Sequence, residues 1–206
     1  MAFCLAHGQC QTKCMEYKSA KSIVFITGTF IGNNCWDEWK SYFERKGYTC
    51  LAPAWPHKDA SPEELRNRPA TDPIALNTLT SFLDHFVSII NDLPEKPILI
   101  GHSLGGLIVQ LLLQKELGIA GVAIHSFPPQ GVTLFLTSGG NDKLIPASLS
   151  HSNYKKYSTA DSVTDYVDFK THTHLVFGVP SWKDEADVVL HWLQGLEKNN
   201  DHYKRI

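Results

Sequence analysis

The feature that most constrains the fold is a serine placed where a predicted strand turns into a predicted helix. The pentapeptide GHSLG, residues 101–105, follows the apolar run at residues 97–100 and precedes an apolar helical segment at residues 106–113. Glycines two residues before and two residues after Ser103 let the backbone turn sharply without a Cβ clash. This context predicts a nucleophile elbow, with first-turn amides of the helix aimed at whatever Ser103 attacks. The alternative is a glycine-rich turn with an inert serine.

Strand-like and helix-like segments alternate along the chain, which predicts the α/β class. We expect a doubly wound, mostly parallel sheet of about six strands with helices on both faces. The expected strands lie at residues 22–27, 48–52, 97–100, 121–124, 132–136 and 163–169. The expected helices lie at residues 34–46, 72–91, 104–113 and 181–196. A chain of 206 residues fits one globular domain, which we place at residues 22–206, after an N-terminal extension at residues 1–21.

Composition excludes several classes of function. The net charge is -2 and lysine and arginine form no face-sized cluster, so no nucleic-acid partner is expected. The longest strongly apolar stretch, near residues 104–113, is far short of the roughly 20 residues of a membrane span. The first 22 residues lack the basic start and apolar core of a secretory signal, and the five cysteines are an odd number. Both features predict a cytoplasmic protein with free thiols.

Four potential metal ligands lie close together near the N-terminus, at Cys4, His7, Cys10 and Cys14. Two or more thiolates with an imidazole can hold zinc. This spacing matches no established metal motif, so we expect these residues to be reduced and unliganded, with zinc binding as the alternative. No metal or cofactor is otherwise implied by the sequence.

A serine nucleophile needs a base and an acid that orients the base. In a doubly wound sheet these groups lie at the carboxyl ends of strands. Among the carboxylates that follow Ser103 and precede the late histidines, Asp142 alone lies in a glycine-rich turn directly after a predicted strand. It is the predicted acid, and the alternative is an ordinary turn aspartate. His172 and His174 follow the last predicted strand. Residues two apart lie on the same face of an extended segment, so the alternation of side chains does not show which of the two is the base.

Two backbone amides are needed to stabilise a developing oxyanion. One is expected from Leu104, which follows the serine, and the other from Thr29 in the loop GTFIG at residues 28–32. We expect Phe30 of the same loop to contact substrate. The segment from residue 54 to residue 73 is rich in proline and charge, and it leaves the carboxyl end of the second predicted strand. Trp55 is predicted to be an apolar wall of an open pocket, with packing on the core as the alternative.

The chain resembles the α/β-hydrolases. The resemblance rests on the elbow GHSLGG at residues 101–106, ITGT at residues 26–29, the acid turn GNDKLIP at residues 140–146, a late histidine, and the order Ser, Asp, His. It runs from about residue 22 to residue 196. In that family the histidine precedes an apolar segment and the last helix, which favours His174 over His172. The serine at the elbow disfavours the family's dehalogenases and epoxide hydrolases, in which the resemblance implies an aspartate.

Two departures from the family pattern concern the first loop and the lid. Thr27 stands where many members have histidine, and only residues 125–131 join the strands at 121–124 and 132–136, where many members insert a lid. A parallel crossover usually needs a dozen or more residues. Either these strands are not parallel neighbours, or the chain lacks a segment of the natural protein. No lid domain is expected.

The resemblance implies a small serine hydrolase that acts on a small-molecule ester, without a cofactor. The expected catalytic residues are Ser103, Asp142 and His174. The same triad could serve a lactonase, a thioesterase or a cofactor-free lyase. A non-catalytic binding module on the same scaffold is the alternative of another class.

Overall fold

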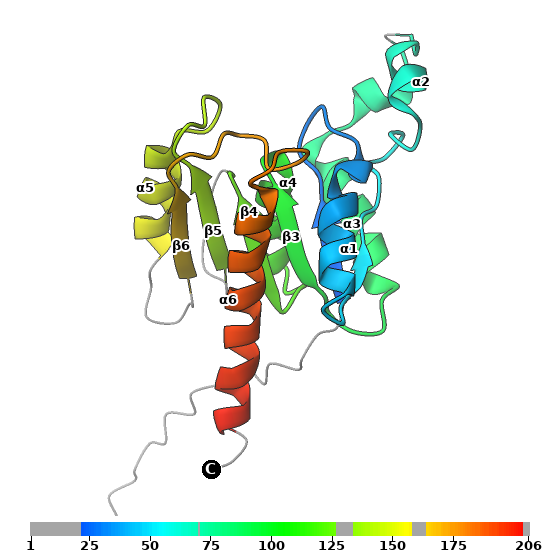
Figure 1. Cartoon of the computed structure of the whole chain (residues 1–206). Helices are drawn as coiled ribbons and strands as arrows, with labels where there is room; N and C mark the ends of the chain where they lie inside the picture. The colour runs from blue at the N-terminus through cyan, green and yellow to red at the C-terminus, as the bar shows by residue number, and fades with distance from the viewer. Residues whose placement is uncertain (1–21, 70, 127–133, 158–163, 204–206) are drawn as a thin grey trace, which may run out of the picture.

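The computed structural model describes residues 22–69, 71–126, 134–157 and 164–203. They form a single six-stranded sheet of order β2-β1-β3-β4-β5-β6, in which all neighbouring strands are parallel (Figure 1). The strands are β1 (Ser22–Ile26), β2 (Thr49–Leu51), β3 (Ile98–His102), β4 (Ala120–Ile124), β5 (Leu134–Gly139) and β6 (Thr164–Phe169). The predicted parallel α/β sheet is therefore confirmed.

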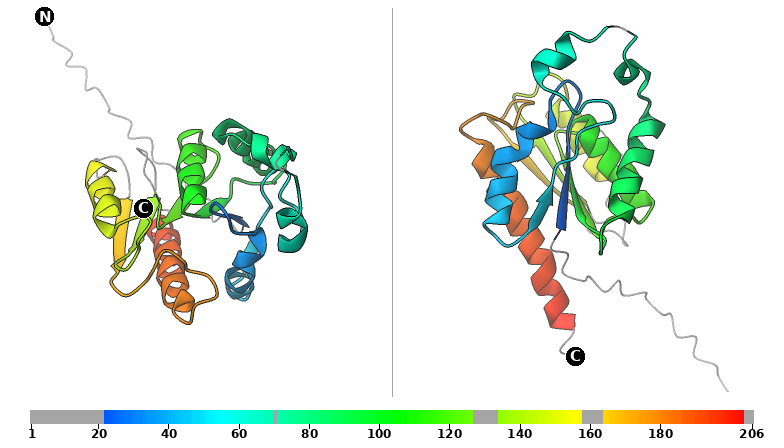
Figure 2. Two further views of the ribbon diagram at one scale, coloured as in Figure 1. Left: turned by 90° about the horizontal axis from the view of Figure 1, so that it is seen from above. Right: turned by 90° about the vertical axis from the view of Figure 1, so that its right-hand side faces the viewer.

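Helices cover both faces of the sheet (Figure 2). The α-helices are α1 (Asp37–Glu44), α2 (Pro62–Arg66), α3 (Leu79–Asn91), α4 (Leu104–Gln114), α5 (Ala147–Tyr157) and α6 (Trp182–Tyr203). Two 3-10 helices, η1 (Asn33–Trp36) and η2 (Pro73–Leu76), precede α1 and α3. Helices α2 and α5 were not predicted from the sequence, and the helix predicted to begin at residue 72 corresponds to η2 and α3. The structure has η2 there, and α3 begins after Thr78, whose side chain accepts a hydrogen bond from the Ser81 amide.

The strands supply side chains to both faces in alternation, which produces two buried clusters. In β1, Ile23 and Phe25 pack with α1 and α6, whereas Val24 and Ile26 pack with α3 and α4. The strand interiors are buried on both sides, as the continuous apolar runs of β1, β3 and β4 require. This rigid sheet holds the carboxyl ends of its central strands in fixed positions.

The strands β4 and β5 are parallel neighbours, paired from Gly121↔Leu134 to Ile124↔Thr137. The expectation that they might not pair is therefore wrong. Nine residues separate Ile124 from Leu134, and at about 3.3 Å per residue they can reach about 30 Å, more than the roughly 17 Å of a five-residue strand. The dozen-residue rule describes crossovers that carry a helix. The other alternative, a segment absent from this chain, stays a hypothesis, and predicted strand residues 132–133 lie outside the described residues.

Candidate active site

Ser103 occupies the tight turn between β3 and α4. Its backbone has φ 54° and ψ -121°, a left-handed region that costs a non-glycine residue on the order of 1–2 kcal/mol. In this turn α4 packs directly against the strands, and glycines at positions 101 and 105 make that close approach possible. A Cβ on Gly101 would lie 2.3 Å from the carbonyl oxygen of Gly105, and a Cβ on Gly105 would lie 2.1 Å from that of Ile26. The strained turn thus lifts Ser103 to the carboxyl edge of the sheet, as an elbow requires.

The neighbouring strand fixes the elbow from the other side. The Ser103 amide donates to the carbonyl of Ile124, at the end of β4, over 2.9 Å. The hydroxyl of Ser126 donates to the carbonyl of Ser103 over 2.7 Å. Both backbone groups of Ser103 are therefore held by β4 and the residues that follow it.

Asp142 and His174 form a hydrogen-bonded pair at the same edge of the sheet. Nδ1 of His174 lies 2.8 Å from Oδ2 of Asp142, whose side chain is fully buried. The other carboxylate oxygen, Oδ1, accepts from the amides of Leu144 and Ile145, each over 2.8 Å. A carboxylate can only accept, so Nδ1 of His174 carries a hydrogen, and in the neutral imidazole the lone pair is then on Nε2. This is the tautomer that a general base needs.

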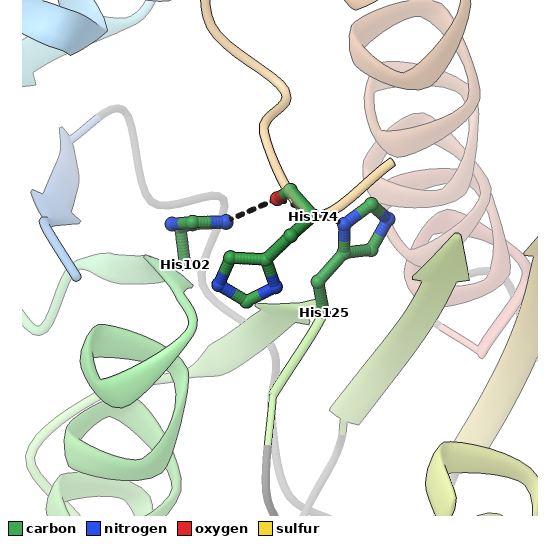
Figure 3. A group of neighbouring side chains, drawn as sticks. All are labelled: His102, His125 and His174. Atoms are coloured by element: carbon green, nitrogen blue, oxygen red, sulfur yellow. Dashed lines mark hydrogen bonds between the residues drawn. The ribbon is translucent and has the colours of Figure 1, made fainter. Parts of the chain in front are cut away.

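The ring of His174 lies next to the elbow. Its centroid is 4.8 Å from that of His102, the residue before Ser103. In Figure 3 one ring nitrogen of His174 is on the side of His125 and the other is on the side of His102. Within the described part of the chain no hydrogen bond joins Ser103 to His174. Such bonds are often long before substrate binds.

His172 has a different partner. Its Nδ1 lies 3.3 Å from Oε2 of Glu185 in the first turn of α6, and its ring stacks on Phe169. The hydrogen bond to Glu185 raises the pKa of His172 above its ordinary value. The structure thus brings His174, and not His172, to Asp142.

The two predicted oxyanion donors are on segments that meet at Ser103. Leu104 is the first residue of α4, so its amide has no acceptor within the helix. Thr29 follows Gly28, where a Cβ would lie 3.0 Å from Cβ of Ser103. The loop after β1 therefore touches the nucleophile, and the role of Thr29 stays a prediction.

The two predicted substrate contacts differ in exposure. Phe30 is 96% exposed, at φ 66° in the loop after β1. Trp55 is only 7% exposed and packs on Phe82 with ring centroids 4.2 Å apart. Trp55 therefore belongs to the core between the sheet and α3, which was the alternative considered for it.

Sequence reasoning missed three buried polar residues around this pair, His102, His125 and Glu185. All are 0% exposed. Burial lowers the pKa of His102 to about 3, so its ring is neutral at physiological pH. Glu185 accepts from the hydroxyl of Thr137 over 2.5 Å and faces both His172 and His125. No sequence signal separates Glu185 from the exposed acidic residues of the same helical turn.

Within the described residues, His102, His125 and His174 are close enough together to hold a metal ion. One ligand atom from each lies within 4.8 Å of the others. The rings of His102 and His125 are, however, both hydrogen-bonded to the backbone carbonyl of His174. The geometry gives this cluster a structural use without a metal. Cys4, His7, Cys10 and Cys14 lie outside the described residues.

Comparison with known proteins identifies the family of this chain. Residues 23–198 match the model of the alpha/beta hydrolase family, and the chain belongs to that family. No curated protein matches the chain at the significance required.

Several solved structures share the fold. A monoacylglycerol lipase from Paleococcus ferrophilus has a TM-score of 0.68 and 16% identity, over 84% of this chain and 93% of that one. Mouse alpha/beta hydrolase domain-containing protein 10 has a TM-score of 0.69 and 15% identity, over 85% of this chain and 90% of that one. A methylesterase from Arabidopsis has a TM-score of 0.67 and 13% identity, over 84% of this chain and 98% of that one. At these identities the likeness shows the fold alone.

Proposed function

We propose that the protein is a serine hydrolase that cleaves carboxylic esters through an acyl-enzyme intermediate. One observation carries the proposal: the hydrogen-bonded pair Asp142–His174 lies beside a strained elbow that presents Ser103. A serine hydroxyl, an imidazole with a free Nε2 and a buried carboxylate behind it are the three groups that acyl transfer requires.

In the first half-reaction Oγ of Ser103 attacks the ester carbonyl while Nε2 of His174 takes the hydroxyl proton. The resulting oxyanion is stabilised by the amides of Leu104 and Thr29. When the tetrahedral intermediate collapses, the C–O bond of the ester breaks and His174 donates its proton to the leaving alcohol. A water molecule, deprotonated by His174, then attacks the acyl carbon; the bond from that carbon to Oγ breaks, His174 returns the proton to Oγ of Ser103, and the acid is released. Asp142 stabilises the imidazolium in both half-reactions.

Exposed apolar side chains favour an ester with an apolar group. Six large apolar residues are exposed within the described part of the chain, all in loops or first helical turns that follow carboxyl ends of strands. They are Phe30, Leu76, Leu79, Leu144, Leu149 and Leu175. Burial of apolar surface contributes about 25 cal/mol per Å², so this edge of the sheet would favour apolar over charged acyl groups.

We also propose that the protein acts in the cytoplasm on a small molecule. Cys35 and Cys50 are free, which is in keeping with a reducing compartment. Burial raises the pKa of each thiol to about 12, so both are poor nucleophiles. No helix in the described ranges has the length and apolar character that a membrane crossing demands.

The test is covalent labelling by a fluorophosphonate, which reacts with an activated serine. The wild type should be labelled, and Ser103→Ala should not, whereas Ser88→Ala, on an exposed position of α3, should be labelled like the wild type. An unlabelled wild type would favour the binding module. Nitrophenyl esters of increasing acyl length, together with a lactone and a thioester, then separate an esterase from a lactonase or a thioesterase.

A further inference from the structure

His174 lies in a stretch without regular secondary structure, between the end of β6 at Phe169 and the start of α6 at Trp182. The position of its backbone therefore depends on side chains. The carbonyl oxygen of His174 accepts from Nε2 of His102 over 2.7 Å and from Nδ1 of His125 over 3.2 Å (Figure 3). A carbonyl can only accept, so both ring nitrogens carry hydrogen. Two imidazoles thus use both lone pairs of this oxygen.

His125 is the less expected of the two imidazoles. It follows β4 directly, is 0% exposed, and has φ 46°, a region that residues other than glycine rarely adopt. Its amide donates to the carbonyl of Thr137 in β5 over 3.1 Å, so its backbone is anchored between two strands. Strained, over-determined residues of this kind cluster at functional sites.

The ring of His125 also lies between two buried carboxylates. Its Nδ1 is 3.9 Å from Oδ2 of Asp142, the oxygen that bonds to His174, and its Nε2 is 3.7 Å from Oε1 of Glu185. Both carboxylate side chains are fully buried. The ring therefore contacts the acid, the backbone of the base and the first turn of α6 at once, and a shift of any of them moves the others.

We propose that His125 is a positioning residue. Its Nδ1–H holds the backbone of His174 and so keeps the Asp142–His174 pair at the right distance from Ser103. The proposal rests on the proposed function, because it takes His174 as the base. His125 itself does not touch substrate. Its contribution is to keep the distance between nucleophile and base, on which the rate of proton transfer depends.

The test uses His125→Ala and His125→Asn. In asparagine the side-chain amide nitrogen is as many bonds from Cα as Nδ1 of histidine, so it can donate to the His174 carbonyl. We expect His125→Ala to lower kcat by about 30- to 100-fold with KM within about twofold, since a displacement of 1 Å can cost about 100-fold. His125→Asn should recover most of the loss. The control is His191→Ala, which removes an exposed imidazole in the middle of α6; its kcat should match that of the wild type.

A second measurement does not require turnover. In protein labelled with ¹⁵N-histidine, the Nδ1 proton of His174 bonded to Asp142 should give a low-field NMR signal that exchanges slowly with water. The signal should broaden or vanish in His125→Ala and return in His125→Asn. An undiminished kcat or an unchanged signal in His125→Ala would overturn the proposal, as would an asparagine variant no better than alanine. If the wild type is not labelled by the fluorophosphonate, the hydrolase function fails separately, and the NMR signal still decides the role of His125.

Discussion

Gly28 lies so close to Ser103 that a Cβ on Gly28 would be 3.0 Å from Cβ of the serine. The same added atom would be 3.1 Å from the backbone carbonyl oxygen of His102. Both distances are tighter than ordinary Cβ contacts, so a side chain at this position would push the loop after β1 and the nucleophile apart by a few tenths of an ångström. This loop carries the proposed second oxyanion donor, Thr29.

The first prediction follows for Gly28→Ala. The extra methyl group should push the loop away from Ser103 and lower kcat by about 10- to 100-fold, because oxyanion donors act only at the right distance. The matched control is Gly195→Ala in α6, where a Cβ meets nothing within 4 Å. That variant should keep full activity and gain up to about 1 kcal/mol of stability, since alanine is the better helix former. Equal activity in both variants would show that the loop does not serve the oxyanion.

The second prediction concerns Ser103 and His174 as a unit. Each single alanine variant should lose on the order of 10³-fold or more in kcat, and the double variant should lose little more than either. The measurement is steady-state hydrolysis of a nitrophenyl ester. His172→Ala should retain activity, because His172 bonds to Glu185 and not to Asp142. An inactive His172→Ala beside an active His174→Ala would show that the base was assigned wrongly.

The third prediction is the pH dependence of hydrolysis. His174 must be unprotonated to accept the proton of Ser103, so kcat/KM should fall at acidic pH, where the imidazole is protonated. His102 does not contribute to this change, because burial holds its pKa at about 3. A rate of the chemical step that stays constant from about pH 5 to about pH 8 would contradict an imidazole base.

The fourth prediction is the pH dependence of stability from His172 and Glu185. The pKa of His172 is raised in the folded protein by its hydrogen bond to Glu185. Its stabilising contribution is therefore full below the unfolded pKa of about 6.5 and is lost as the pH rises through the raised folded value. Urea unfolding of the wild type and of His172→Gln should show a larger difference in unfolding free energy at about pH 5.5 than at about pH 8.5. A difference independent of pH would mean that the pair is not charged in the folded state.

The fifth prediction separates Trp55 from Phe30. Trp55→Ala removes a buried ring and should cost about 3–5 kcal/mol of stability, with ester chain-length preference unchanged. Phe30→Ser alters a side chain that is 96% exposed, so the melting temperature should stay within about 2 °C while KM for long-chain esters rises. Thermal unfolding and an acyl-length series measure both effects. A change of chain-length preference in Trp55→Ala would instead make its ring part of the pocket wall.

The sequence was most informative where local chemistry and topology agree. Continuous apolar runs identified the buried strands, and the glycines around Ser103 predicted a turn that the structure shows at φ 54°. Asp142 was found because it directly follows a strand in a parallel sheet. His174 was separated from His172 by family resemblance, and the geometry agrees, because of these two histidines it is His174 that bonds to Asp142.

The features that escaped prediction depend on contacts between distant segments. Glu185 looks like an ordinary acidic residue at a helix start, and its burial against Thr137, His125 and His172 follows only from the packing of α6 on the sheet. His125 follows a strand without any flanking motif. The five-residue helix α2 and the longer helix α5 lack a clear apolar period, so local pattern was a poor guide to them.

The short connection between β4 and β5 bears on how the chain folds. The partners Gly121 and Leu134 are 13 residues apart, whereas Ile23 and Ile98, paired across β1 and β3, are 75 residues apart. Loop-closure entropy grows with the logarithm of length, so the first pairing costs about 1.5 kcal/mol less than the second. We expect β4 and β5, with α4 packed on β4, to associate before β1 joins the sheet. The strands that carry His125 and Asp142 would then be assembled first, and the loop of Gly28 would reach the nucleophile late in folding.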